Sequence, residues 1–375
     1  MTATSTHETP TSIDSASESA APAPELDQAK LEAFLHRAVG DMGAIASGAL
    51  TLTGHRLGLF RAMAGAGPLT PAELAKRTGT RERNVREWLN AQAAGGYVNY
   101  DPGRGTYELP PEQAFALANP DSPVFLAGGF DLLAAMWAAA ERMVSVFRDG
   151  GGMGWHEHDH RLFDGTEYFF RPGYRAHVVA EWIPALDGVE EKLRRGAKVA
   201  DVGCGHGASA IIMAESYPRS SFLGIDYHDG SVAVARERAR VAGVDDRVRF
   251  EVAPASQLPG EGYDLVCFFD CFHDLGDPVG AARRARAALA RGGTVMLVEP
   301  NASDRVADNL NPLGRLFYSA STFLCTPNSL SQEVGLALGA QAGEARLREV
   351  LKEAGFSRVR RATETPFNIV LEARP

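Results

Sequence analysis

The sequence has few cysteines and no excess of positive charge. Its four cysteines are Cys204, Cys267, Cys271 and Cys325. Only Cys267 and Cys271 lie close together, and no second pair completes a zinc-finger pattern, so we expect reduced, buried thiols in a cytoplasmic protein. The 47 acidic and 38 basic residues give a net charge of −9. This charge argues against nucleic acid or an anionic membrane as the main partner, because phosphate binding requires a basic surface.

The sequence also lacks a long uninterrupted apolar run. The longest apolar stretch, residues 123–140, contains Asp131 and two glycines, and we interpret it as buried helix rather than a membrane span. Residues 1–25 are mostly Thr, Ser, Ala, Glu and Pro, without the apolar segment of a signal peptide. We expect them to form a disordered tail, because this composition cannot bury a hydrophobic core.

Residues 26–120 have the pattern of a helical domain that ends in a β-hairpin. Thr70 and Glu73 have the spacing of a capping box, which predicts the start of a helix. A further helix follows, and then two short strands are predicted over 97–100 and 106–109. Helices followed by a hairpin are typical of a winged helix, so we predict a winged-helix-like domain here.

The remainder of the chain changes from helix to alternating strand and helix. Residues 121–195 are predicted to form a helical connector that contributes to a substrate pocket. From 196–375 the alternation indicates parallel βαβ units. We therefore predict an α/β protein with a Rossmann-like seven-stranded sheet and an N-terminal α-helical winged-helix domain. The predicted strands are 197–202, 221–226, 247–252, 263–269, 293–299, 357–362 and 367–372.

A glycine-rich loop, Gly203-Cys204-Gly205-His206-Gly207, follows the first strand of this sheet. Glycine permits a tight turn and a close approach of the backbone to a ligand. The next helix offers free N–H groups and a partial positive charge at its N-terminus. Asp226 ends the second strand, about twenty residues past the loop, where an acidic residue accepts hydrogen bonds from ribose hydroxyls.

Two cofactors and one ligand-free alternative compete for this loop. A dinucleotide requires G-x-G-x-x-G, so that the backbone clears a pyrophosphate, but here the third glycine comes one residue early. The pattern G-x-G-x-G, with Asp201 two residues before its first glycine, resembles the signature of the class I methyltransferases. In that family the loop faces the amino-acid end of S-adenosylmethionine. The ligand-free alternative is a glycine turn that only joins strand and helix.

The resemblance implies S-adenosylmethionine as the cofactor and methyl transfer as the activity. It implies that the amino-acid end of the cofactor is contacted at the loop by Asp201, Gly203, Gly205 and Gly207, and that the ribose is contacted by Asp226. It also implies adenine contacts after the third strand, at Ala255 and Ser256, and contacts beside the cofactor at the end of the fourth strand, at Phe269 and Asp270.

The segment His273-Asp274-Leu275 follows the fourth strand and resembles the His-Asp-Trp segment of the winged-helix O-methyltransferases. In that family the histidine is the general base, which implies that His273 takes the proton of a substrate hydroxyl. Leu275 stands where those enzymes carry tryptophan, and many methyltransferases have a non-catalytic His-x-Leu at this place. A role for His273 in capping the next helix or contacting the cofactor therefore stays open.

The resemblance extends over about residues 30–375. The winged-helix N-terminal part and the tail, from 327–333 through 363–368, resemble an actinobacterial group of methyltransferases. The resemblance implies O-methylation of a small molecule of secondary metabolism, with C- or N-methylation of a natural product or metabolite as the alternative. It also implies a homodimer formed through the N-terminal domain. A second alternative is a DNA-binding regulator, because Arg81, Arg83 and Arg86 lie on the helix that a DNA-binding winged helix would use.

Aromatic side chains are candidates for the walls of a substrate pocket. The candidates are Trp137, Trp155, Phe163, Tyr168, Phe169, Phe170 and Tyr174, together with Tyr318 after the fifth strand, although ordinary helix packing would account for the same residues. The stretch 156–160 contains three histidines and two carboxylates, which suggests zinc or iron. These residues are adjacent and no distant ligand joins them, so we favour a solvated loop or pocket rim and predict no metal.

Overall fold

The computed structural model describes residues 26–375, so the predicted disordered tail lies outside the described residues. The chain divides into two compact units, residues 1–45 and 46–375. Helix α1 (Gln28–Arg56) begins in the first unit and ends in the second. Within 26–375, no helix combines the length and apolar character needed to cross a membrane. The predicted domain boundaries stay predictions.

The second unit begins with a small helical fold whose hairpin is the expected wing. Its elements are α2 (Leu59–Met63), α3 (Pro71–Thr78), α4 (Glu82–Ala94), β1 (Asn99–Asp101), β2 (Thr106–Glu108) and α5 (Pro111–Leu117). The capping box is present: the Thr70 hydroxyl accepts a hydrogen bond from the backbone N–H of Glu73, whose carboxylate accepts one from the Thr70 N–H. Strands β1 and β2 pair antiparallel, which confirms the hairpin.

A helical segment connects this part to the sheet. It comprises α6 (Gly129–Ala138), α7 (Ala140–Asp149), the 3-10 turn η1 (Trp155–Glu157), α8 (Arg161–His177), η2 (Val178–Trp182) and α9 (Val189–Arg195). Helices α6 and α8 pack at Gly165, where an added Cβ would lie 2.3 Å from the backbone nitrogen of Leu132. The glycine therefore permits the close approach of the two helices.

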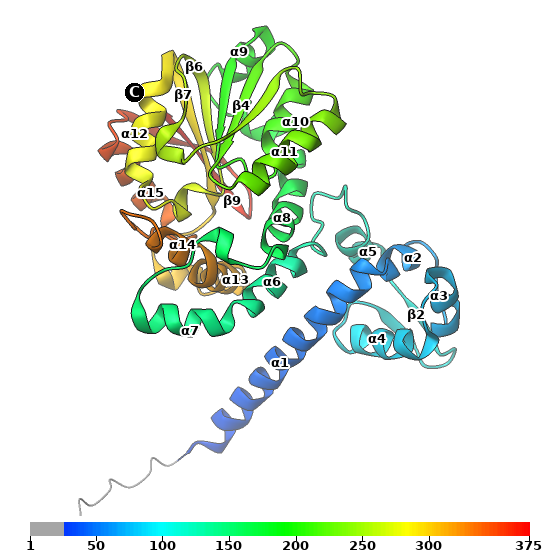
Figure 1. Ribbon diagram of the computed structural model, residues 1–375. Coiled ribbons are helices and arrows are strands. Elements are labelled where there is room, and N and C mark those ends of the chain that lie inside the picture. Colours follow the sequence, from blue (N-terminus) through cyan, green and yellow to red (C-terminus); the bar gives the residue numbers. More distant parts are fainter. Residues whose placement is uncertain (1–25) are drawn as a thin grey trace, which may run out of the picture. The chain divides into compact units, whose positions relative to one another are not determined.

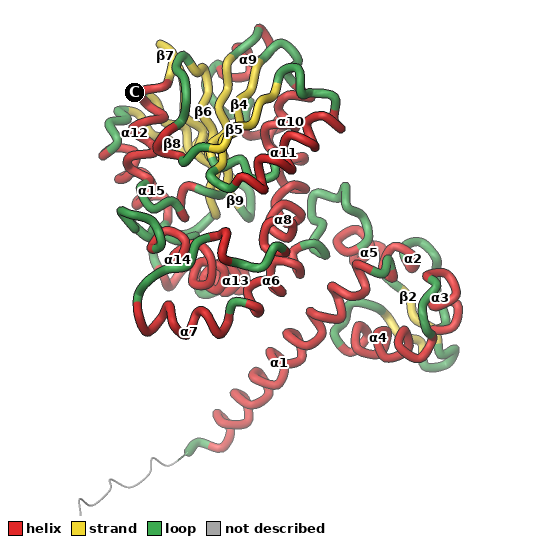
Figure 2. Tube along the Cα trace, in the orientation of Figure 1, coloured by secondary structure: helices red, strands yellow, loops and turns green. Residues whose placement is uncertain are grey.

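The sheet has seven strands in the order β5-β4-β3-β6-β7-β9-β8 (Figures 1 and 2). The first five are parallel, and β9 is antiparallel to both β7 and β8. The final pair departs from the expected parallel units, because the few residues between β8 and β9 cannot hold a crossover helix. The strands are β3 (Lys198–Val202), β4 (Ser221–Asp226), β5 (Val248–Val252), β6 (Tyr263–Phe269), β7 (Leu289–Pro300), β8 (Arg358–Glu364) and β9 (Asn368–Arg374).

Helices cover both faces of the sheet (Figure 1). Val199 and Ala200 are neighbours on β3 but belong to different buried clusters, because successive side chains of a strand point to opposite faces. The first cluster includes residues of α10 (Ala208–Ser216) and α11 (Asp229–Ala242), and the second includes residues of α12 (Pro278–Ala288) and α15 (Gly343–Glu353).

Shorter elements lie at the carboxyl ends of the parallel strands or between β7 and α15. The former are η3 (Ala255–Gln257) and η4 (Phe272–Asp274). The latter are η5 (Val306–Asn309), α13 (Pro312–Ala320), η6 (Ser321–Cys325) and α14 (Thr326–Leu330). Ligands of open α/β sheets bind outside the carboxyl ends of the strands, so these elements frame the candidate site.

Candidate active site

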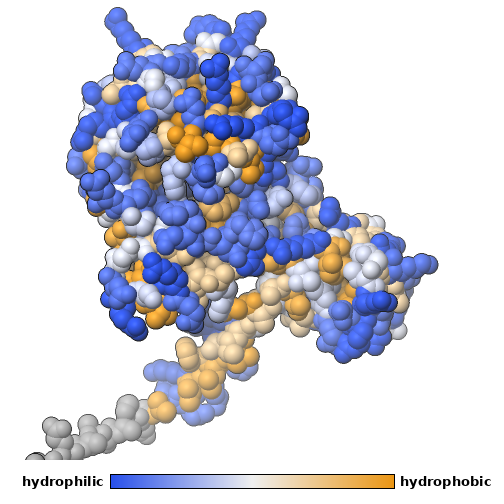
Figure 3. Space-filling model, in the orientation of Figure 1, coloured by the Kyte–Doolittle hydropathy of each residue, from blue (hydrophilic) through white to orange (hydrophobic). Residues whose placement is uncertain are grey.

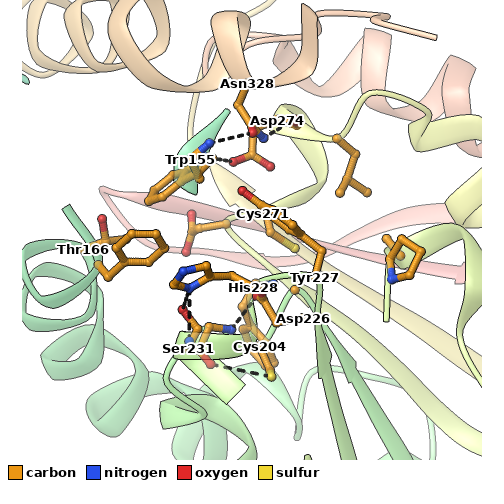
Figure 4. Close-up of a pocket in the computed structure, with 18 of the residues that line it drawn as sticks. Trp155, Thr166, Cys204, Asp226, Tyr227, His228, Ser231, Cys271, Asp274 and Asn328 are labelled. Carbon is orange, nitrogen blue, oxygen red and sulfur yellow. Dashed lines mark hydrogen bonds between the residues drawn. The ribbon is translucent and has the colours of Figure 1, made fainter. Parts of the chain in front are cut away.

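A cavity of about 600 Å³ opens at the carboxyl ends of β3, β4 and β6 (Figure 4). Its walls come from the glycine loop, from the residues that follow β4, β5 and β6, from α8 and η1, and from the segment around α14. Elements that are far apart in the sequence therefore build one site. The volume lies in the range of about 300–1,000 Å³ that is typical of small-molecule sites.

The glycine loop forms one wall of the cavity. Gly203, Gly205 and Gly207 all have positive φ, a conformation that side chains with a Cβ rarely adopt. An added Cβ at Gly205 meets no atom within 4 Å, whereas one at Gly207 would lie 2.7 Å from the ring of Phe250. Gly203 and Gly205 line the cavity, and Gly207 does not. At Gly203 an added Cβ would lie 2.7 Å from the sulfur of Cys271, so only Gly205 presents bare backbone to open space, and Gly203 and Gly207 permit close packing.

Asp226 lines the cavity and fixes the loop. Its Oδ2 accepts a hydrogen bond of 3.0 Å from the backbone N–H of Gly205, and its Oδ1 accepts one of 2.9 Å from the N–H of His228. Burial raises the pKa of this carboxyl, and the two N–H donors oppose the rise. Each carboxylate oxygen has a second lone pair, so the group can accept further hydrogen bonds from a ligand.

Asp201 lies behind the loop rather than in the cavity. It is 1% exposed, and its Oδ2 accepts a 2.5 Å hydrogen bond from the hydroxyl of Ser209. Burial raises its pKa to about 7. The structure therefore does not bring Asp201 to the cavity wall, although Ala255, Ser256, Phe269 and Asp270 all reach it.

Asp270 holds a strained position at the end of β6. Its φ of 49° is left-handed, which is uncommon for a residue with a side chain. The hydroxyl of Tyr174 donates to Oδ2 at 2.8 Å, and the amide of Asn368 donates to Oδ1 at 2.7 Å. Burial, followed by the charge of Glu299, raises the pKa of Asp270 to about 7. Strained backbone of this kind is concentrated at functional sites.

His273 is buried and does not line the cavity. Its Nδ1 lies 2.6 Å from Glu299 Oε2, and the backbone N–H of Phe272 donates to Glu299 Oε1 at 3.0 Å. Burial opposes protonation of the imidazole, but the charge of Glu299 and contact with Cys325 outweigh it and hold the pKa of His273 well above its ordinary value. The general-base role of His273 stays a prediction.

Asp274 does line the cavity, and Trp155 holds it there (Figure 4). The indole Nε1 of Trp155 donates to Asp274 Oδ2 at 2.8 Å. Burial raises the pKa of Asp274 to about 7, against the charge of His273 and the hydrogen bond from Trp155. The amide of Asn328 joins these parts, because it accepts from the backbone N–H of Trp155 and donates to the backbone oxygen of Asp274.

Only some of the predicted aromatic residues line the cavity. Trp155 and Tyr174 line the cavity, whereas Trp137, Tyr168 and Tyr318 do not, and Trp137 is 63% exposed. Phe163, also among the predicted aromatic residues, lines the cavity and stacks on His228 with 4.3 Å between ring centroids. Asn328 lines the cavity too. Asn328 lies 173 residues after its partner Trp155, and no local pattern indicates that pairing.

The histidine-rich stretch gathers no metal-binding group. Across residues 26–375, no cluster of three or more His, Cys, Asp or Glu side chains has an arrangement that could hold a metal ion. His156 lines the cavity, and the side chain of His158, two residues later, is buried. This agrees with the preference for a pocket rim at His156.

Two family models match the chain. The Rv2258c-like winged HTH domain matches residues 46–119, and a methyltransferase domain matches residues 193–355. Among curated relatives, 27-O-demethylrifamycin SV methyltransferase of Amycolatopsis mediterranei is 37% identical over 107 residues, or 28% of this chain and 39% of that protein. Acetylserotonin O-methyltransferase of Mus musculus is 28% identical over 333 residues, or 82% of this chain and 80% of that protein.

The rifamycin methyltransferase and an uncharacterized protein of Synechococcus sp., which is 35% identical over 99 residues, are matched over only 39% and 24% of their own lengths. Solved structures match nearly the whole chain. The mitomycin 7-O-methyltransferase MmcR has a TM-score of 0.67 at 19% identity, covering 92% of this chain and all of that one. Human N-acetylserotonin methyltransferase in complex with SAM has a TM-score of 0.65 at 17% identity, covering 94% and 99%. These likenesses confirm the predicted fold class.

Proposed function

We propose that this chain, which belongs to the class I S-adenosylmethionine-dependent methyltransferases with an N-terminal winged-helix domain, transfers a methyl group to a hydroxyl oxygen of a small molecule. The observation that carries the proposal is one cavity that combines the bare glycine backbone, the buried Asp226 carboxylate and a second wall of aromatic and acidic side chains.

The residues present fit S-adenosylmethionine. An added Cβ at Gly205 would meet open space, so the backbone there is accessible to a ligand. We assign Gly203 and Gly205 to the amino-acid end of the cofactor, Asp226 to the ribose hydroxyls, and Ala255 and Ser256 to the adenine. When bound, the cofactor supplies an electrophilic methyl group on a sulfonium.

Other residues support this arrangement from behind. Asp201 and Gly207 do not line the cavity, so we assign them the task of shaping the loop rather than touching the cofactor. Phe269 and Asp270 end β6 beside the cofactor, where Tyr174 holds the Asp270 carboxyl through its hydroxyl. Trp155 and Phe163 exclude water from the opposite wall, which favours a close approach of substrate oxygen and methyl carbon.

A hydroxylated ring compound of secondary metabolism is the proposed substrate. The names of the rifamycin, mitomycin and acetylserotonin relatives all denote methyl transfer, and the last two specify an oxygen acceptor. The cavity matches such an acceptor, because it places aromatic surface next to polar groups.

The test is methyl transfer from deuterated S-adenosylmethionine to simple phenols and to extracts rich in natural products. Mass spectrometry identifies the labelled product, and fragmentation shows which atom carries the methyl group. The proposal expects labelled methyl ethers. Methylation at nitrogen or carbon, or no labelled product, would contradict it.

We further propose a homodimer in the cytoplasm. The part of α1 in the first unit exposes Phe34, Leu35, Val39, Met42 and Ile45, and this apolar surface is visible as orange side chains in Figure 3. Exposed apolar surface of this size is typical of an interface, and a second copy of the chain would bury it. The four cysteines are free thiols, as expected in a reducing compartment.

A further inference from the structure

The geometry points to Asp274, rather than the adjacent His273, as the proton acceptor for the substrate hydroxyl, with Trp155 and Glu299 positioning it. This inference rests on the proposed function and assigns the proton transfer at the same site. The sequence resemblance implies this role for His273, but the carboxylate that faces the cavity belongs to the next residue.

Access to the cavity separates the two residues. A general base must lie within hydrogen-bond reach of the proton that it takes. Both side chains are largely buried, but Asp274 lines the cavity and His273 lies outside its lining. The imidazole already faces Glu299 at 2.6 Å, and that carboxylate favours its protonated form. A protonated imidazole has no lone pair with which to accept another proton.

The Asp274 carboxylate keeps one oxygen available. Its Oδ2 accepts the indole N–H of Trp155, and its Oδ1 accepts no hydrogen bond from any residue within 26–375. In Figure 4, Trp155 and Asp274 meet above Cys271, in the part of the cavity that faces the end of β6. Burial raises the pKa of Asp274 to about 7, which makes it a stronger base than an ordinary aspartate.

The protein fixes this carboxylate from several sides. Glu299 holds the first two residues of η4, through the backbone N–H of Phe272 and the imidazole of His273. On the other side, Asn328 donates to the backbone oxygen of Asp274 at 2.9 Å, and the hydroxyl of Ser329 donates to that of Leu275 at 2.8 Å. Such preorganisation is what a catalytic group requires, because little reorganisation remains to be made during the reaction.

The proposed step balances in protons and electrons. The substrate O–H proton moves to Asp274 Oδ1, the electron pair of the broken O–H bond stays on the substrate oxygen, and a lone pair of the substrate oxygen forms the new bond to the methyl carbon. The carbon–sulfur bond breaks, and its electron pair stays on sulfur. The protonated Asp274 then releases its proton to solvent when the site opens, and the carboxylate is restored.

The test compares two phenols that differ in the need for a base. At about pH 8.5, 4-methylphenol is neutral and 4-nitrophenol is already ionised, so only the first requires a proton acceptor. We expect Asp274→Asn to lower kcat/KM for 4-methylphenol by about 100-fold or more, in the range typical of general bases. Its loss with 4-nitrophenol should be less than about tenfold, because that nucleophile carries no proton to remove.

Controls separate the role from folding and from cofactor binding. Glu353→Gln neutralises an exposed carboxylate outside the cavity lining and should stay within about twofold of wild type. Calorimetric affinity for S-adenosylhomocysteine should be retained by Asp274→Asn, which shows that the variant folds. Trp155→Phe removes the donor that favours the ionised carboxylate, so the acid limb of the kcat/KM profile for 4-methylphenol should move to higher pH.

Different failures have different meanings. Equal losses with both phenols, or an Asp274→Asn variant as active as wild type on 4-methylphenol, would overturn the assignment while leaving the proposed function intact. Wild-type protein that binds S-adenosylhomocysteine but methylates neither phenol would count against a hydroxyl acceptor, and the proton-acceptor assignment would fail with it.

Discussion

The buried pair of Glu299 and His273 provides a quantitative test of the site. Glu299 is 1% exposed on its side chain, His273 is 6% exposed, and their closest atoms are 2.6 Å apart. Removal of one partner from a buried ion pair typically costs about 3–5 kcal/mol, because the other charge is left uncompensated. We therefore expect Glu299→Gln to lower the free energy of unfolding by about that amount near pH 6.5.

The pH dependence of this loss follows from the raised pKa of His273. A histidine whose pKa is higher in the folded than in the unfolded state contributes stability that is complete below its unfolded pKa, about 6.5. Above that value the contribution declines by about 1.4 kcal/mol per pH unit until the folded pKa is passed, because the folded state alone keeps the proton.

The assay is urea unfolding of wild type, Glu299→Gln, His273→Asn and the double variant at about pH 7.5 and pH 8.5. In this range the buried aspartates with a pKa of about 7 are largely ionised in the folded state. The coupling energy of the pair should fall by about 1.4 kcal/mol between the two pH values. A coupling energy that stays constant would refute an ionised histidine–carboxylate pair.

Two further predictions concern packing and assembly. Gly165→Ala should destabilise the protein by about 1–3 kcal/mol in chemical denaturation, because the added Cβ would lie 2.3 Å from the backbone of Leu132. The control is Gly173→Ala in the same helix, whose added Cβ meets no atom within 4 Å, and equal stability of both variants would contradict the packing argument. The double variant Phe34→Glu/Val39→Glu should convert the proposed dimer to a monomer, measured as a lower mass in light scattering, with unchanged secondary structure. The polar-face variant His36→Glu is the control and should stay dimeric. A mass of the double variant equal to that of wild type would contradict an interface on α1.

The sequence was sufficient to predict the local elements of the sheet. Strands β4 and β6 begin and end at the predicted residues 221–226 and 263–269, because short apolar runs bounded by turn residues have few alternatives. The antiparallel pairing of β9 was not predicted, since strand direction depends on the tertiary fold. The predicted fold class is confirmed by the solved structures, and family models match the predicted winged-helix and methyltransferase regions at residues 46–119 and 193–355.

The candidate site was predictable only where its residues are close in sequence. The glycine loop and Asp226 meet as the strand–loop–helix spacing implies, through the bond between Gly205 and Asp226. The contact between Trp155 and Asp274 joins residues 119 positions apart, and no local pattern encodes it. Spacing also cannot show which side of a loop faces the cavity, so the positions of Asp201 and Gly207 behind it required the structure.

Calorimetric titration with S-adenosylhomocysteine tests the central claim most directly. We expect wild-type protein to bind one equivalent per chain. Asp226→Ala should bind at least about 100-fold more weakly, corresponding to about 2.7 kcal/mol, because it loses the carboxylate that holds Gly205 and that we assign to the ribose hydroxyls. Asp229→Ala, which removes a nearby acidic side chain outside the cavity, should bind like wild type. No heat with wild type, or equal affinities of wild type and Asp226→Ala, would contradict a cofactor site at the glycine loop.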